Sequence, residues 1–239
     1  MSGVFSDLIA YLADPNSWTG QDGIIARLSE HIGLSVLAVV LAVILALPPA
    51  MVLAHRRKGS VLAVGLVNVG RAVPTFGVIA LALPLCLALG LGLGFWPTLI
   101  AMVVLAMPPI FTNTYTAVRQ VDPAVVEAAE GMGFTGRQVM TGTELPLGMP
   151  VIWTAIRIAS VQVVATATLG AIVGWGGLGR YVVDGFAQGN DVLVLLGGLL
   201  VALLAVATDL GFSATERLVL PPGATHRDRG ELATAIGHG

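Results

Sequence analysis

The residues of this sequence that could take part in binding or transport are the polar side chains inside its long apolar stretches. Gln162 and Thr166 lie four positions apart in one such stretch, so a helix there places them on one face, with Thr168 offset from it. Polar groups are costly in hydrocarbon and usually face a neighbouring helix or a water-filled path. Hydroxyl and amide groups form hydrogen bonds without carrying net charge. They therefore suit either a solute path or a contact between two helices.

A second group of polar residues lies in two other apolar stretches. Asn68 and Arg71 are three positions apart, and Pro74 can kink a helix because it has no amide hydrogen. Asn113 lies near the end of a further apolar stretch. Arg71 could instead extend its side chain to the headgroup region. The candidates for a path are Asn68, Arg71, Pro74, Asn113, Gln162, Thr166 and Thr168.

Several kinds of reactive site are not indicated. The sequence contains no phosphate-binding GxxxxGK[ST] loop, so we expect no ATP hydrolysis and no cofactor in this chain. Its four histidines show no metal-ligand spacing, so we expect no metal. The single cysteine, Cys86, lies in an apolar run and is expected to be a small buried hydrophobe. An intramembrane enzyme would need a buried Ser-His or paired Asp, and neither is visible.

The composition indicates that lipid surrounds most of this chain. Of its 239 residues, 56% are hydrophobic and 11% are charged, whereas a soluble domain carries about 25% charged residues. The net charge is -2, and no basic run exceeds residues 55–58, so nucleic acid is not expected as a partner. We therefore predict an all-α polytopic membrane protein.

Five apolar segments approach the ~20 residues that a helix needs to cross hydrocarbon. The second is too long for one straight helix, so it is either one kinked helix, which we favour, or an interfacial helix followed by a span from near Val73. A short interfacial helix is also expected at 23–31, where apolar positions share one face. The expected spans are 32–54, a part of 61–93, 97–118, 151–173 and 192–212.

Lysine and arginine fall mainly on one side of these spans, and cytoplasmic loops carry the excess of these residues. The N-terminus is therefore predicted outside and the C-terminus in the cytoplasm. Residues 1–29 form an extracytoplasmic segment, 30–212 the membrane domain with a cytoplasmic loop at 119–150, and 213–239 a poorly ordered cytoplasmic tail. The bases placed inside are Arg56, Arg57, Lys58, Arg119, Arg137, Arg217, Arg227 and Arg229; those outside are Arg27 and Arg180.

The loop at 119–150 has the signals of two short helices. Asp122-Pro123 is a helix start, and Gly131 and Gly133 can end that helix. Thr135 and Gln138 fit a capping box for a second short helix, which leads through Leu145-Pro146 into the next span. Small residues allow another surface to approach closely. The residues alone fit a plug for a groove on a partner, or a solvated loop.

The pattern Glu127-Ala128-Ala129, Gly133 and Leu145-Pro146 resembles the EAA motif of permease subunits of type I binding-protein-dependent ABC importers. Thr143 stands where that family often has isoleucine. The resemblance covers about residues 30–212 and implies the type I permease fold in the cell membrane. It also implies that the loop forms a coupling helix in a cleft of a cytoplasmic ATPase. The coupling residues would be Glu127, Ala128, Ala129, Gly133, Leu145 and Pro146.

Further stretches resemble the glycine betaine/carnitine/choline branch of these permeases, at 68–76, 108–115, 121–123, 162–169 and 176–179. This resemblance implies an osmoprotectant cargo such as glycine betaine, choline, carnitine or proline betaine. The implied partners are two ATPase subunits that hold ATP and Mg, a second permease chain, identical or homologous, and an extracytoplasmic binding protein. Glycines in 174–179 are expected to permit tight packing against that binding protein or the second permease chain.

Two other functions remain open from the sequence. The cargo could be another small solute, such as an amino acid. The chain could also be a stand-alone secondary transporter or a channel component, which would predict inverted repeats and an acid near mid-membrane. The acid that comes nearest, Asp209, lies towards the end of the last span.

Overall fold

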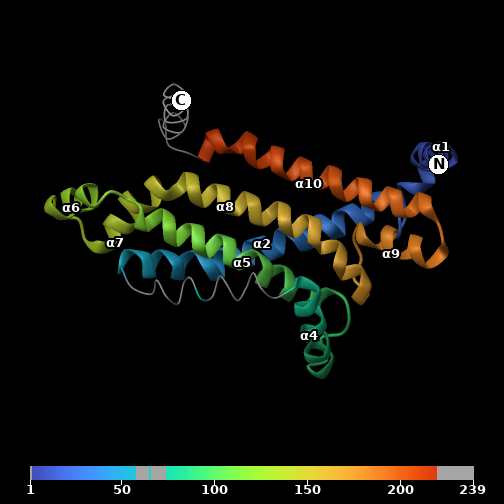
Figure 1. Cartoon of the computed structure of the whole chain (residues 1–239), viewed down its shortest axis with the longest axis horizontal. Coiled ribbons are helices and arrows are strands. Elements are labelled where there is room, and N and C mark those ends of the chain that lie inside the picture. Colours follow the sequence, from blue (N-terminus) through green and yellow to red (C-terminus); the bar gives the residue numbers. More distant parts are fainter. Residues whose placement is uncertain (1, 58–64, 66–73, 220–239) are drawn as a thin grey trace, which may run out of the picture.

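Four long helices run roughly alongside one another and make up most of the protein (Figure 1). The computed structural model of the protein describes residues 2–57, 65 and 74–219, which form helices and turns without a strand. The long helices are α2 (Ile24–His55), α5 (Phe95–Arg119), α8 (Leu145–Thr166) and α10 (Asp191–Val219). An all-α architecture is thus confirmed for these residues.

Shorter helices occupy the two ends of this bundle. We call the end with α6 and α7 the loop end; α1 and α9 lie at the opposite end, and α4 projects away from the bundle (Figure 1). The helices are α1 (Ser2–Ala13), α4 (Thr75–Ala88), α6 (Pro123–Gly131), α7 (Gly136–Val139) and α9 (Gly179–Gln188). Further helical elements are two 3-10 helices, Pro15–Ser17 and Ala167–Val173, and one π-helix, Met140–Glu144.

Four of the five expected spans are confirmed as helices that are long and apolar enough to cross a membrane. The remaining expected span, within 61–93, corresponds in the described residues to α4, which has only 14 residues and is about 21 Å long. At Pro74 the backbone is extended, with ψ at 134°, and the helix begins at Thr75. A single kinked helix through Pro74 is therefore wrong, because the extended residue breaks the helical hydrogen bonding there.

Three boundaries differ from expectation. The segment 23–31 is not a separate interfacial helix, because it continues without a break into the first span as α2. The cause is a buried stripe that already begins at Ile24 and continues through His31 and Leu34. At the other terminus α10 continues past residue 212 to Val219, into the segment expected to be a tail. Residues 220–239 of that tail lie outside the described residues.

Small residues allow α2 to pack closely on α5. Every fourth residue of α2 from 38 to 50 is alanine, and all four are fully buried. They face Met102, Ala106 and Ile110 of α5 in the largest hydrophobic cluster. Side chains of this size let two helix backbones approach closely, which favours association in lipid through van der Waals contact. The other face of α2 exposes Val36, Val40 and Ile44, as a lipid-facing helix does.

Candidate functional site

Helix α6 begins and ends at the residues that the sequence predicts. The Asp122 carboxylate accepts a hydrogen bond from the Ala124 amide at 2.9 Å, and Pro123 is the first helical residue. At the other end Gly133 has φ at +86°, a left-handed conformation that favours glycine. Its amide donates to Glu130 O at 2.9 Å, and the Phe134 amide donates to Ala129 O at 3.2 Å. These two bonds form a Schellman motif, which turns the chain sharply.

The second helix of the loop starts with the expected capping box. The Thr135 amide donates to Gln138 Oε1 at 2.8 Å, and the Gln138 amide donates to Thr135 Oγ1 at 3.4 Å. This short helix leads into the next span as expected, but the helical stretch begins well before residue 151. It continues through the π-helix into α8, so that Gly136–Val173 is one helical stretch. The wide π turn directly precedes Leu145 and Pro146. Pro146 has no amide hydrogen, so it would otherwise interrupt the hydrogen bonds of a regular α-helix.

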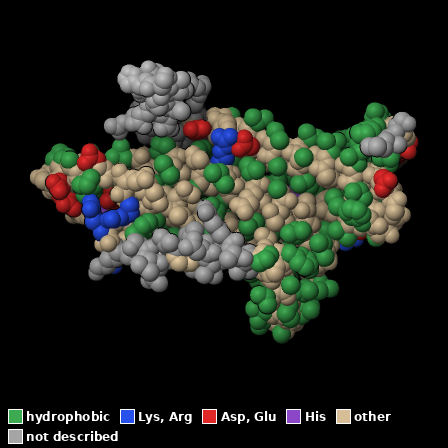
Figure 2. All heavy atoms as spheres, in the orientation of Figure 1, with side chains coloured by type: hydrophobic (Ala, Val, Ile, Leu, Met, Phe, Trp, Pro, Cys, Tyr) green, Lys and Arg blue, Asp and Glu red, His purple; other side chains and the backbone are tan. Residues whose placement is uncertain are grey.

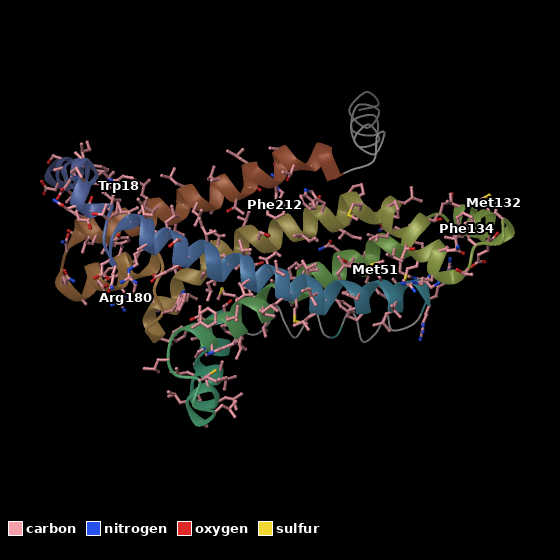
Figure 3. All side chains as sticks on the ribbon, turned by 180° about the vertical axis from the view of Figure 1, so that it is seen from behind. Trp18, Met51, Met132, Phe134, Arg180 and Phe212 are labelled. Atoms are coloured by element: carbon pink, nitrogen blue, oxygen red, sulfur yellow. The ribbon has the colours of Figure 1, made fainter. Side chains whose placement is uncertain are left out.

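The EAA triplet divides between two faces of α6. Ala129 is 3% exposed and packs inward, whereas Glu127 and Ala128 face outward. Met132 and Phe134, at 71% and 43% exposure, lie at the tip of the loop end (Figure 3). Acidic and basic side chains also gather at this end, whereas the face of the bundle seen in Figure 2 is mostly uncharged. Large exposed apolar side chains at a polar tip make this surface a candidate for a protein contact.

The sequence reasoning missed Met132 and Phe134 as candidate contact residues. The available signal was the pair of bulky apolar residues inside the glycine-rich stretch 131–136. The remaining motif residues have another role in the structure. Leu145 and Pro146 are half-buried at the start of α8, where Leu145 packs against Met51 of α2. They therefore attach the loop to the bundle, while α6 and the following turn present its outer surface.

Gln162 lies on the one face of α8 that is exposed along its length within the described residues. Thr166 shares this helix and is half-buried. Thr168 follows in the 3-10 helix, and its hydroxyl donates to Ala165 O at 3.0 Å. The exposed stripe of α8 consists of Leu147, Val151, Thr154, Ile158, Gln162 and Ala165. The expected common face of Gln162 and Thr166 thus borders a surface on which another chain or a path can lie.

The other path candidates are more scattered. Asn113 is half-buried on α5, and its side-chain amide donates to Pro109 O of the same helix at 2.7 Å. Pro74 is exposed at the N-terminal cap of α4. Asn68 and Arg71 lie outside the described residues, so their role stays a prediction. The structure therefore brings Gln162 and Thr166 together and leaves Asn113 and Pro74 on separate helices.

An apolar groove of about 620 Å³ lies between α2, α8 and α10. Its walls include Val36 and Val40 of α2, Ile156 of α8, and Leu204 and Phe212 of α10. None of the candidate path residues in the described part of the chain lines it. The groove is therefore a different surface from the exposed stripe of α8.

An ion pair joins α8 to α10. Arg157 Nε and Nη2 donate to the two carboxylate oxygens of Asp209 at 2.6 and 2.7 Å, which is the strong bidentate arrangement. One turn away on α8, the Trp153 indole donates to Phe212 O at 3.3 Å. This pair gives Asp209 a partner that holds two helices together, a role that does not require it to carry protons.

Close contacts at the opposite end of the bundle explain the glycines after α8. A Cβ at Gly176 would collide with the Glu30 carboxylate, and one at Gly177 would lie 3.0 Å from His31 Nδ1. Gly179 similarly lies against the carbonyl oxygen of Thr168. The tight approach that we expected against another protein is thus made by this chain itself, mainly by α2.

Tyr181 of α9 strengthens this end. Its hydroxyl donates to Asp22 O at 2.9 Å, and burial, as the largest cause, raises the pKa of Tyr181 to about 12. The phenol consequently stays protonated and can donate at any physiological pH. Arg27 forms ion pairs with both Asp22 and Glu30 close by. Among the described residues no cluster of His, Cys, Asp and Glu could hold a metal ion.

Comparison with known proteins agrees with this architecture. Residues 24–220 match the family described as the binding-protein-dependent transport system inner membrane component, and the chain belongs to this family. It is therefore a multi-pass membrane component of a transport system that works with a binding protein.

Two curated relatives and one solved structure are similar to this chain. The glycine betaine/carnitine/choline transport system permease protein OpuCB of Bacillus subtilis is 32% identical over 82% of this chain and 88% of that protein. The osmoprotectant import permease protein OsmW of Salmonella typhimurium is 30% identical over 91% of this chain and 99% of that protein. The MetNI methionine ABC transporter in an inward-facing conformation matches with a TM-score of 0.72 at 21% identity, over 83% of this chain and 96% of that one. At that identity the structural match establishes the type I permease fold alone.

Proposed function

We propose that this chain is the permease subunit of an ABC importer that carries a quaternary-amine osmoprotectant across the cell membrane. The cargo would be glycine betaine, choline, carnitine or proline betaine, because relatives of nearly full length are named as permeases for such solutes. The N-terminus would lie outside and the C-terminus in the cytoplasm, as the distribution of arginine and lysine indicates.

The observation that carries the proposal is the outer surface of the loop end. Glu127 and Ala128 face outward from α6, and Met132 and Phe134 expose apolar surface beside them. We infer that this surface enters a cleft on one of two cytoplasmic ATPase subunits, which hold ATP and Mg, and that the second permease chain engages the other. Glu127 would pair with a base of the ATPase, and the two apolar residues would lose their contact with water.

The cargo would pass between this chain and a second permease chain, identical or homologous. The exposed stripe of α8 supports this placement, because it carries the Gln162 amide on a face without a neighbouring helix in the described residues. Asn68, Arg71, Pro74, Asn113, Thr166 and Thr168 remain candidates for the same path. An extracytoplasmic binding protein would supply the affinity for the cargo, so the path needs only weak contacts.

Copurification followed by transport tests this function. The tagged chain is extracted from native membranes in mild detergent, and its partners are identified by mass spectrometry. The recovered complex is then placed in liposomes, and ATP-dependent uptake of radiolabelled glycine betaine is measured. Recovery of an ATPase together with uptake supports the proposal. A monodisperse chain without an ATPase would refute it, and uptake of an amino acid instead of glycine betaine would correct the cargo.

A double variant tests the surface itself. Met132→Ser and Phe134→Ser remove apolar area at the tip without touching the bundle, so the ATPase should be lost while the chain still folds. Phe186→Ser is the matched control, because Phe186 is also exposed, at 73%, but lies on α9 at the opposite end of the bundle. If both the double variant and the control retain the ATPase equally, the contact surface lies elsewhere.

A further inference from the structure

His55 and Glu144 join two segments that are 89 positions apart in the sequence. His55 is the last residue of α2, and Glu144 is the last residue of the π-helix, directly before α8. The imidazole Nδ1 lies 2.7 Å from Glu144 Oε2, so Nδ1 donates to the carboxylate. Glu144 is only 6% exposed. A carboxylate buried to this extent needs its hydrogen bond, because an unpaired one would lose hydration without compensation.

The surroundings fix the imidazole ring in place. A Cβ at Gly136 would lie 3.2 Å from His55 Nε2, so the backbone of α7 lies against the side of the ring opposite Nδ1. Around this contact Met51, Val118 and Met140 form an apolar cluster with the neighbouring turns. Apolar surroundings strengthen a hydrogen bond and make its loss costly. The His55 side chain, with 24% of its surface exposed, therefore lies half-buried between the end of α2 and the residues that precede α8.

The same helix α2 also holds the far end of α8. Glu30 Oε2 accepts a hydrogen bond from the Gly177 amide at 2.7 Å. His31 Nδ1 accepts from the Leu178 amide at 3.3 Å, so Nε2 carries the proton and donates to Val164 O at 2.8 Å. These contacts lie at the opposite end of the bundle from His55. Side chains of α2 thus hold the start of α8 at one end, and the last turns of α8 and the segment after it at the other.

We propose that the His55–Glu144 hydrogen bond is the positioning contact through which displacement of the loop moves α2 together with α8. This inference rests on the proposed function, in which the ATPase displaces the loop. A π turn is a local irregularity in a helix, and helices bend at such turns. Without the His55 contact, displacement of α6 and α7 would be absorbed at Met140–Glu144 before it reached α8. With the contact, the displacement reaches α2 and, along its length, the Gly176–Leu178 segment at the opposite end.

The test measures the glycine betaine transported for each ATP hydrolysed by the whole complex in liposomes with its binding protein. His55→Ala removes the contact. His55→Asn can restore it, because the asparagine amide nitrogen occupies nearly the position of Nδ1 and donates to Glu144. Val52→Ala is the matched control, since Val52 is 38% exposed one turn earlier on the outer side of α2. All variants are first compared for recovery of the ATPase.

The expected result is a loss of coupling and not a loss of assembly. In His55→Ala the cargo carried per ATP should fall roughly fivefold, the lower end of coupling between linked sites. His55→Asn should recover most of it, Val52→Ala should match the natural chain, and His55→Ala combined with Glu144→Ala should be no worse than His55→Ala alone.

Two results would overturn the inference. One is an unchanged ratio in an assembled His55→Ala complex. The other is a parallel loss of ATPase recovery, hydrolysis and uptake that His55→Asn does not restore, since that would make the contact purely structural. A natural chain that neither retains an ATPase nor takes up glycine betaine would instead refute the proposed function.

Discussion

The left-handed turn at Gly133 allows a prediction that depends on backbone conformation alone. An L-residue in this conformation costs about 1–2 kcal/mol. A Cβ added at Gly133 meets nothing within 4 Å, so Gly133→Ala introduces strain without a collision. Gly131 is also open, but it belongs to α6 and has no positive φ. Gly131→Ala is therefore the matched control, and it should stabilise the helix by up to about 1 kcal/mol.

The strain raises the population of molecules in which the turn at Gly133 is open. Since each 1.4 kcal/mol is a factor of ten, Gly133→Ala should raise that population about 5- to 30-fold. Arg137 is exposed four residues after Gly133, so trypsin reports the opening. When opening is fast relative to cleavage, the cleavage rate follows the open population. The assay is the rate of cleavage after Arg137 in purified, detergent-solubilised protein, with the fragment followed by mass spectrometry.

The cleavage rates of the two variants show whether the left-handed turn at Gly133 holds the loop. Gly133→Ala should be cleaved about 5- to 30-fold faster than the natural chain, and Gly131→Ala no faster than it. Equal cleavage of the two variants would show that the left-handed turn does not hold the loop. The reasoning from φ would then be refuted, whatever partner the loop binds.

Three further outcomes follow from contacts at other places. Arg157→Met or Asp209→Leu alone should lower the melting temperature in detergent more than the two changes together, because each single variant leaves one charge without its partner. Gly179→Ala should cost about 1–3 kcal/mol by overpacking against the backbone of Thr168, measured as a shift in the denaturation midpoint. Tyr181→Phe should cost about 0.5–1.5 kcal/mol below pH 10 by removing the hydrogen bond to Asp22 O. The raised pKa makes the contribution of Tyr181 complete below pH 10.0 and lost as the pH rises to about 12, so the difference between the natural chain and Tyr181→Phe should shrink over that interval.

Features made by neighbours in the sequence were predictable. The caps at Asp122 and Thr135 and the turn at Gly133 depend on partners within five residues, so their residue types were sufficient evidence. The four long helices were likewise predictable, because apolar length alone determines whether a helix can cross hydrocarbon. The extent of the last helix was underestimated, because its final turns are polar and the hydropathy of the sequence does not indicate a helix there.

Contacts between distant segments were not predictable from one sequence. Nothing in the residue order pairs Arg157 with Asp209 or His55 with Glu144, because packing of whole helices brings them together. The glycines at 176 and 177 were recognised as sites of close approach, but their partner was assigned to another protein and is in fact α2. The helical stretch that begins at Gly136 was expected as a span only from residue 151, because the polar residues before it give no hydropathy signal and a π turn is hard to foresee.

The π-helix also makes the direction of this connection tolerant of a change in its length. One residue of an α-helix corresponds to about 100° of rotation, and a π turn accommodates a residue more than an α turn. Deleting a single residue from Met140–Glu144 would therefore let an ordinary α turn form, with α7 and α6 kept close to their present direction relative to α8. Deleting a residue from the α-helical start of α8 would instead rotate α7 and α6 by about 100° relative to the rest of α8. The outward face of α6 would then point sideways, although every residue on it was unchanged.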